Sequence, residues 1–185
     1  MTCHLATLAA AALLAGCVQA PPLAAPVPPT SEAPRFDPFA FFLGASEGTG
    51  TLAKIMAENT PIRVTSMGRI ETEARREASW AAPPARVLVL DQVVTEGDKP
   101  ARKRQWRLTE VAPGRYTGTL SNAISPVEAC AEGNRLVITF TIKGGFSVRQ
   151  ELTLAPSGQS AANVMQVSKL GLNVAVLSED IRKTP

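Results

Sequence analysis

The segment LVITFTIKGGFSVRQELTL, residues 136–154, decides the fold of this 185-residue chain. Large apolar side chains fill its even positions as far as Ile142, and the alternation resumes at Phe146 after the Gly144-Gly145 pair. A period of two residues is that of a β-strand with one buried face. A glycine pair between two such runs is typical of a hairpin turn. The segment therefore predicts an antiparallel hairpin that turns one face toward a core.

The same pattern of short strands and turn residues extends over the chain from Gly44 onward. No run of ten or more residues after position 45 predicts a helix, and residues 75–84 have no readable pattern. Eight or nine sequential antiparallel strands favour an all-β fold, a single up-and-down barrel, because a closed barrel leaves no exposed sheet edge. The predicted strands are 48–58, 62–72, 86–95, 102–111, 115–120, 136–142, 146–154, 163–169 and 172–181.

Four of the six phenylalanines lie between Arg35 and Leu43, beside Asp37-Pro38. Asp followed by Pro is a helix-start signal, so we expect a short N-terminal helical turn that covers one end of the sheet. A patch of aromatic side chains that touches a membrane is the alternative.

The N-terminal stretch Leu14-Ala15-Gly16-Cys17 resembles the bacterial lipobox and closes an uncharged apolar run that begins at Leu5. That run is too short to span a bilayer, which needs about 20 residues, but suits the core of a signal peptide. We expect residues 1–16 to be removed and Cys17 to be acylated. An ordinary secretory signal with a chance cysteine is the alternative, and the absence of Lys and Arg before the run favours it.

Lipidation would make the remainder a tethered domain. Val18 rather than Asp follows the cysteine, so we expect an outer-membrane lipoprotein that faces the periplasm. Residues 17–34 hold six prolines and predict an extended tether, about 50 Å long at about 3.1 Å per residue. Residues 35–185 then form one barrel domain.

Composition excludes several function classes. His4 is the only histidine and would leave with the signal peptide, which excludes Ser-His-Asp and Cys-His catalysis and histidine-ligated metals. We therefore expect no enzyme, no catalytic residue, no metal and no cofactor. Cys130 would be the one free thiol, so no intramolecular disulfide is expected; between two alanines it predicts a small buried side chain. The net charge of +3 argues little for nucleic acid.

Further pieces of sequence resemble a family of uncharacterised bacterial lipoproteins, a domain of unknown function. The resemblance implies a small lipocalin-like barrel and no established reaction. Two departures, Val137 and Thr139 where the family has aromatics and the plainer residues 157–164, imply a differently lined interior. The matching pieces are 41–44 with Gly48 and Gly50, 90–91 with 96–98, 104–108, 116–118, 133–134 and 168–171.

The strand 102–111 supplies the main candidate ligand site. Arg104, Trp106 and Leu108 share one face, so an inward indole brings the guanidinium with it. Counting across the loop places Asp91 opposite Trp106, which predicts an inward Asp91–Arg104 ion pair. Either this pair is structural, or Arg104 binds the head group of an acidic lipid while Trp106 contacts its chain. Tyr116, the only tyrosine, joins Arg104, Trp106 and Asp91 as a ligand-binding candidate.

Two features point outward. The basic residues between Lys99 and Arg107 fit a solvated edge or anionic lipid head groups better than nucleic acid. The strands 87–94 and 172–177 are apolar on both faces, which predicts a covering element, with 36–42 as the candidate, or a partner.

Three hypotheses follow: a tethered barrel that binds or shuttles a fatty acid or phospholipid, a packed barrel that docks to an envelope protein of unknown identity, and, least favoured, an enzyme of lipid metabolism. An apolar interior larger than about 300 Å³ would separate the first from the second.

Overall fold

The computed structural model describes residues 33–73 and 85–185. The predicted signal peptide, Cys17, most of the tether and the segment 75–84 therefore lie outside the described residues. The described elements are α1 (Pro38–Phe41), β1 (Gly44–Lys54), β2 (Thr60–Glu73), β3 (Ala85–Glu96), β4 (Arg102–Ala112), β5 (Arg115–Leu120), β6 (Val127–Glu132), β7 (Arg135–Ile142), β8 (Phe146–Leu154), β9 (Ser160–Lys169) and β10 (Leu172–Lys183).

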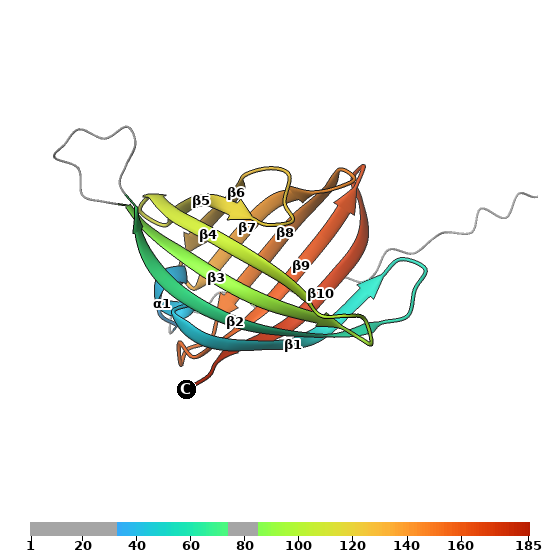
Figure 1. Cartoon of the computed structure of the whole chain (residues 1–185), viewed down its shortest axis with the longest axis horizontal. Helices are drawn as coiled ribbons and strands as arrows, with labels where there is room; N and C mark the ends of the chain where they lie inside the picture. Colours follow the sequence, from blue (N-terminus) through green and yellow to red (C-terminus); the bar gives the residue numbers. More distant parts are fainter. Residues whose placement is uncertain (1–32, 74–84) are drawn as a thin grey trace, which may run out of the picture.

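The strands form one closed antiparallel barrel in which each strand pairs with its neighbours in sequence and β10 pairs with β1 (Figure 1). This confirms the all-β, lipocalin-like barrel, but the barrel has ten strands, and the expected eight or nine was too few. The missed strand is β6, whose sequence VEACAE turns only small side chains inward after Val127. Alanine has little β-propensity, so the strand gives a weak signal.

The hairpin of residues 136–154 is confirmed as β7 and β8. Leu136 pairs with Leu152 and Phe140 with Val148 across the hairpin, and all four side chains are buried. Gly144 and Gly145 both have positive φ, at 85° and 73°. Glycine adopts this conformation without the steric penalty of a side chain, which explains the glycine pair at the turn.

The helical turn α1 closes one end of the barrel, as expected. Asp37 caps it by accepting a hydrogen bond from the backbone N–H of Phe39 at 2.8 Å, and Pro38 fits the first helical position. The rings of Phe36, Phe39, Phe41 and Phe42 are buried in the interior core, which argues against a membrane-touching patch. They also do not cover the outer face of β3, as one alternative predicted.

The two ends of the barrel therefore differ. The closed end holds α1 (left in Figure 1) and the turns that begin β5 and β7. The mouth is the opposite end, formed by the loops 55–59, 97–101, 121–126, 143–145 and 170–171.

Candidate functional site

The interior of the barrel is nearly filled. One cavity of about 30 Å³, the space of about one water molecule, lies among side chains of β1, β2, β3, β4, β7, β8 and β10. Its walls are mainly apolar, but five polar side chains reach it: Ser66, Gln92, Arg104, Gln150 and Glu179. These side chains mark the level of the barrel at which polar groups reach the interior.

A row of inward polar side chains crosses the four strands β1 to β4 at one level. Ser46 pairs with Ser66, Ser66 with Gln92, and Gln92 with Arg104 in the cross-strand register. We call these four residues the polar belt. Directly opposite residues have Cβ atoms about 5 Å apart, so each belt side chain lies within reach of the next.

Gln92 is the centre of the belt. Its Oε1 accepts hydrogen bonds from Arg104 Nε and from Trp106 Nε1, both at 2.7 Å, and its Nε2 donates to Ser66 Oγ at 2.9 Å. The Arg104 guanidinium carbon lies 5.7 Å from the centre of the Trp106 ring, within the range of a cation–π contact. The network fixes both Arg104 and Trp106 on the inner face, as the sequence predicted.

Arg104 is a partly buried cation without a close counter-charge. Burial lowers its pKa to about 10, and the more distant Glu179 partly opposes that shift, so the side chain is charged at neutral pH. Within the described residues it makes no ion pair shorter than 4.0 Å. A charge that loses contact with water is stable only when other groups compensate it, and among the described residues its hydrogen-bond partner is the neutral Gln92.

Glu179 faces the belt from β10. Its Oε2 accepts a hydrogen bond from Asn163 Nδ2 at 2.7 Å. Burial raises the pKa of its carboxyl, while Asn163 and the Arg104 charge act in the opposite direction. Gly48 makes room for this carboxyl group, because a Cβ atom there would lie 2.0 Å from Glu179 Oε1.

Two further polar atoms at this level are buried and have no hydrogen-bond partner among the described residues: Ser46 Oγ and Asn163 Oδ1. Buried polar groups in proteins are nearly always paired with protein or water. Together with Arg104, they leave unused capacity for hydrogen bonds on the inner faces of β1, β4 and β9.

The apolar side chains of the interior form two clusters, which share Met165. The larger cluster, which includes Leu88, Trp106 and Phe140, extends to α1. The second cluster lies on the mouth side and contains Ile62, Val64 and Leu177, with partly exposed Leu52, Val94 and Met165 packed against it. An apolar chain that enters through the mouth would meet this second cluster first and the belt next.

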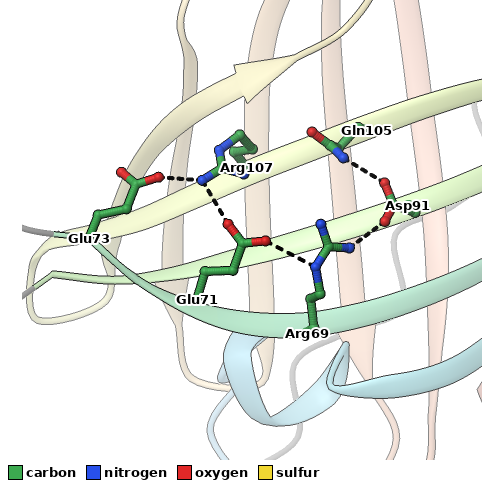
Figure 2. A network of polar contacts seen from close by, with 6 residues as sticks. All are labelled: Arg69, Glu71, Glu73, Asp91, Gln105 and Arg107. Atoms are coloured by element: carbon green, nitrogen blue, oxygen red, sulfur yellow. Dashed lines mark hydrogen bonds and ion pairs between the residues drawn. The ribbon is translucent and has the colours of Figure 1, made fainter.

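The predicted Asp91–Arg104 ion pair is wrong. Asp91 pairs with Gln105 rather than Trp106 in the register, and a shift by one residue turns a side chain to the opposite face. On the outer face Asp91 accepts hydrogen bonds from Gln105 Nε2 at 2.7 Å and from Arg69, and these bonds lower its pKa. Figure 2 shows Asp91 in an outer network with Arg69, Glu71, Glu73, Gln105 and Arg107.

This outer network explains why β3 is apolar on both faces. Val89 is directly opposite Arg69 on one side and Arg107 on the other, and it is 0 % exposed. The aliphatic parts of long charged side chains cover apolar surface while their charged ends remain in water. Among the described residues, Arg69 and Arg107, rather than residues 36–42, are thus the neighbours of Val89 on the outer face.

Tyr116 points inward at the closed end, away from the polar belt. Its ring lies 6.0 Å from that of Phe39, and burial raises its pKa to about 12. It lines a groove of about 380 Å³ beside α1 instead of the cavity that Arg104 and Trp106 reach. The four candidate residues are therefore not brought together: only Arg104 and Trp106 share a site.

Cys130 is exposed, so its predicted burial is wrong. It lies between the inward Ala129 and Ala131 on β6, and strand alternation turns it outward. The burial of Cys130 could be predicted correctly only from the alternation of β6, a strand that was not among those predicted.

An ion-pair cluster at the mouth, three basic side chains around one carboxylate, was not predicted from the sequence. Glu96 accepts hydrogen bonds from Lys54, from Lys99 at 2.6 Å and from Arg102 at 2.9 Å. The bonds from Lys54 and Lys99 lower its pKa to about 2. The concentration of basic residues near Lys99 was the signal in the sequence, but the shared acceptor depends on where β1, β3 and β4 end.

In the parts of the chain that the structure describes, no group of three or more His, Cys, Asp or Glu side chains could hold a metal ion. Across the same residues, no helix has both the length and the apolar character that crossing a membrane requires.

No protein-family model and no curated protein matches this chain. Its structure is similar to that of the S-type phycobiliprotein lyase CPES from Guillardia theta, with a TM-score of 0.57 and 10 % identity over 80 % of this chain and 90 % of that one. It is also similar to Rv2717c from M. tuberculosis, with a TM-score of 0.52 and 11 % identity over 79 % and 94 % of the two chains. At such low identity these similarities establish the lipocalin-like barrel fold alone.

Proposed function

We propose that this protein is a non-catalytic, lipid-anchored envelope protein whose barrel binds an apolar chain with an acidic head group, such as a fatty acid or a phospholipid. The anchor is Cys17, acylated after removal of residues 1–16, which places the domain on the periplasmic side of the outer membrane. The lipobox-like residues 14–17 support this location.

The observation that carries the binding proposal is the charge of Arg104 at the inner end of an apolar passage. The guanidinium is partly buried, it donates a hydrogen bond to Gln92 through Nε, and it makes no close ion pair within the described residues. A carboxylate or phosphate is the partner that a guanidinium binds most strongly. An acyl chain that enters head first would bring its acidic group to the belt and leave its tail on the mouth-side cluster.

A second candidate function is a packed barrel that docks to another envelope protein. The cavity of about 30 Å³ favours it, because ligand pockets usually exceed about 300 Å³. Under the first proposal, Leu52, Val94 and Met165, which are only partly buried, must move apart to admit a chain.

Titration with dodecanoate separates the two functions. The binding proposal expects saturable binding by the full chain, a loss of at least roughly tenfold in Arg104→Gln from one charged hydrogen bond, and partial recovery in Arg104→Lys. Lys103→Gln is the matched control, since it removes a neighbouring charge from the outer face. Absence of saturable binding, or equal losses in Arg104→Gln and Lys103→Gln, would refute ligand binding at the belt.

A further inference from the structure

Two hairpins at the mouth present exposed apolar side chains at their tips. Met56, between β1 and β2, is 88 % exposed, and Leu170 and Leu172, at the turn between β9 and β10, are 95 % and 69 % exposed. The hairpins are neighbours, because β1 pairs with β10 and the backbone N–H of Ile55 donates to the carbonyl of Val174 at 2.9 Å. We call Met56, Leu170 and Leu172 the apolar tips.

The backbone at these tips is unusual. Met56 has a φ of 55° and Leu170 a φ of 51°, and they are the only residues other than glycine with positive φ in the described parts of the chain. This conformation is unfavourable for large side chains, and residues that adopt it are most often Gly, Asn or Asp. The turns thus hold large apolar residues in water at the two positions where small or polar ones would be most stable, which indicates a contact outside the barrel.

The charge around the tips indicates what they contact. Among the described residues, the mouth loops and the strand ends that border them contain five cations and three carboxylates. One of the carboxylates, Glu96, is already bound by three of those cations. Lys143 and Lys169 make no ion pair among the described residues, and Lys169 Nζ lies 4.7 Å from the centre of the Phe146 ring. The cations are Lys54, Lys99, Arg102, Lys143 and Lys169, and the carboxylates are Glu58, Glu96 and Asp98.

Exposed apolar side chains with lysines nearby are typical of surfaces that bind an anionic bilayer. We propose that the mouth of the barrel docks on an anionic phospholipid bilayer, with the apolar tips inserted between head groups and Lys143 and Lys169 facing the lipid phosphates. A protein partner would gain less from lysine ammonium groups, because lysine is depleted in protein interfaces.

This docking surface is distinct from the predicted anchor. The described chain enters the barrel at the closed end, where the backbone N–H of Phe36 donates to the carbonyl of Gly133 at 2.8 Å. The mouth is therefore at the opposite end from the start of the described domain. The proposal holds whether or not the interior binds a ligand, and it supplies a route for one, since a docked mouth opens directly onto lipid.

The test is flotation of the full chain with vesicles of phosphatidylcholine, alone or mixed equally with phosphatidylglycerol. The variants Met56→Asn and Leu170→Asn remove the apolar side chains and keep a residue that tolerates positive φ, so they should fold at least as stably as the parent. Val111→Asn is the matched control, because Val111 is 61 % exposed near the closed end of β4. The parent and all variants also carry Cys17→Ser, so that acylation at Cys17 does not mask the contribution of the tips.

Docking at the mouth predicts that each tip substitution weakens binding to the mixed vesicles about tenfold, the low end for loss of a buried leucine-sized side chain. Lys143→Glu with Lys169→Glu should abolish the preference for the anionic vesicles, and raised salt should do the same in the parent chain. Val111→Asn should bind like the parent. Equal vesicle binding by parent and tip variants would overturn the proposal, as would an absence of binding to either vesicle, which would assign the tips to a protein partner.

Discussion

The substitution Gln92→Met tests whether the polar belt is a buried network that holds Arg104 in place. Methionine has a similar shape but no strong acceptor, so Arg104 Nε, Trp106 Nε1 and Ser66 Oγ each lose the bond that Gln92 provides. A lost bond to a buried charged group costs about 1.5–3 kcal/mol, and a buried neutral group left unpaired costs about 1–3 kcal/mol. Because Ser66 and Arg104 are only partly buried, we expect a total loss of about 3–5 kcal/mol.

The assay is urea unfolding followed by far-ultraviolet circular dichroism, with the change in free energy taken at constant slope. Gln105→Met is the matched control. It makes the same chemical change one residue before Trp106, but on the outer face, where Gln105 Nε2 has only the bond to Asp91. We expect the control to lose less than about 1 kcal/mol. Equal losses in the two variants would show that Gln92 is not the centre of a buried network, and would refute this account of Arg104.

Three other predictions concern the carboxylates and the glycine of the interior. The pKa of Glu179 is raised in the folded state, so its contribution to stability is fully present below pH 4.5 and declines as pH rises through the folded pKa. Glu179→Gln should therefore raise the melting temperature at pH 7 but not at pH 4. The same difference in melting temperature between variant and parent at both pH values would contradict this. The pKa of Glu96 falls from 4.5 to about 2, so its stabilisation is present above pH 4.5 and is lost as pH falls toward 2. Glu96→Gln should lower the melting temperature at pH 7 and remove that part of the acid dependence; identical acid-unfolding curves for variant and parent would count against it. Gly48→Ala should cost about 2 kcal/mol in urea unfolding, because the new Cβ displaces the Glu179 carboxyl from Asn163, and a cost near zero would show that Glu179 is free to move.

Much of the barrel could be predicted from the sequence because alternation of side chains is a local property. The predicted strand 146–154 has the bounds of β8, and the predicted strand 136–142 differs from β7 only at the first residue. The inward face of β4 followed from the same rule once Trp106 was assumed to point inward. The strand β6 failed because Ala129 and Ala131 provide almost no contrast with their neighbours.

The site could be predicted only in part, because it depends on register between strands. Arg104 and Trp106 lie on one strand, so their shared face could be predicted. To predict the β3 partner of Arg104, the register between β3 and β4 must be known. The predicted register was wrong by one residue, so the outward Asp91 was chosen in place of the inward Gln92. Glu179 and Asn163 lie on β10 and β9, and no local pattern relates them to β4.

The most direct test of the central claim is native mass spectrometry of the protein extracted from its own cell envelope and released from its anchor. An acidic lipid bound at the belt predicts an added mass that corresponds to one such lipid and that disappears in Arg104→Gln but persists in Lys103→Gln. An empty parent protein in repeated preparations, or an added mass that Arg104→Gln retains, would contradict it.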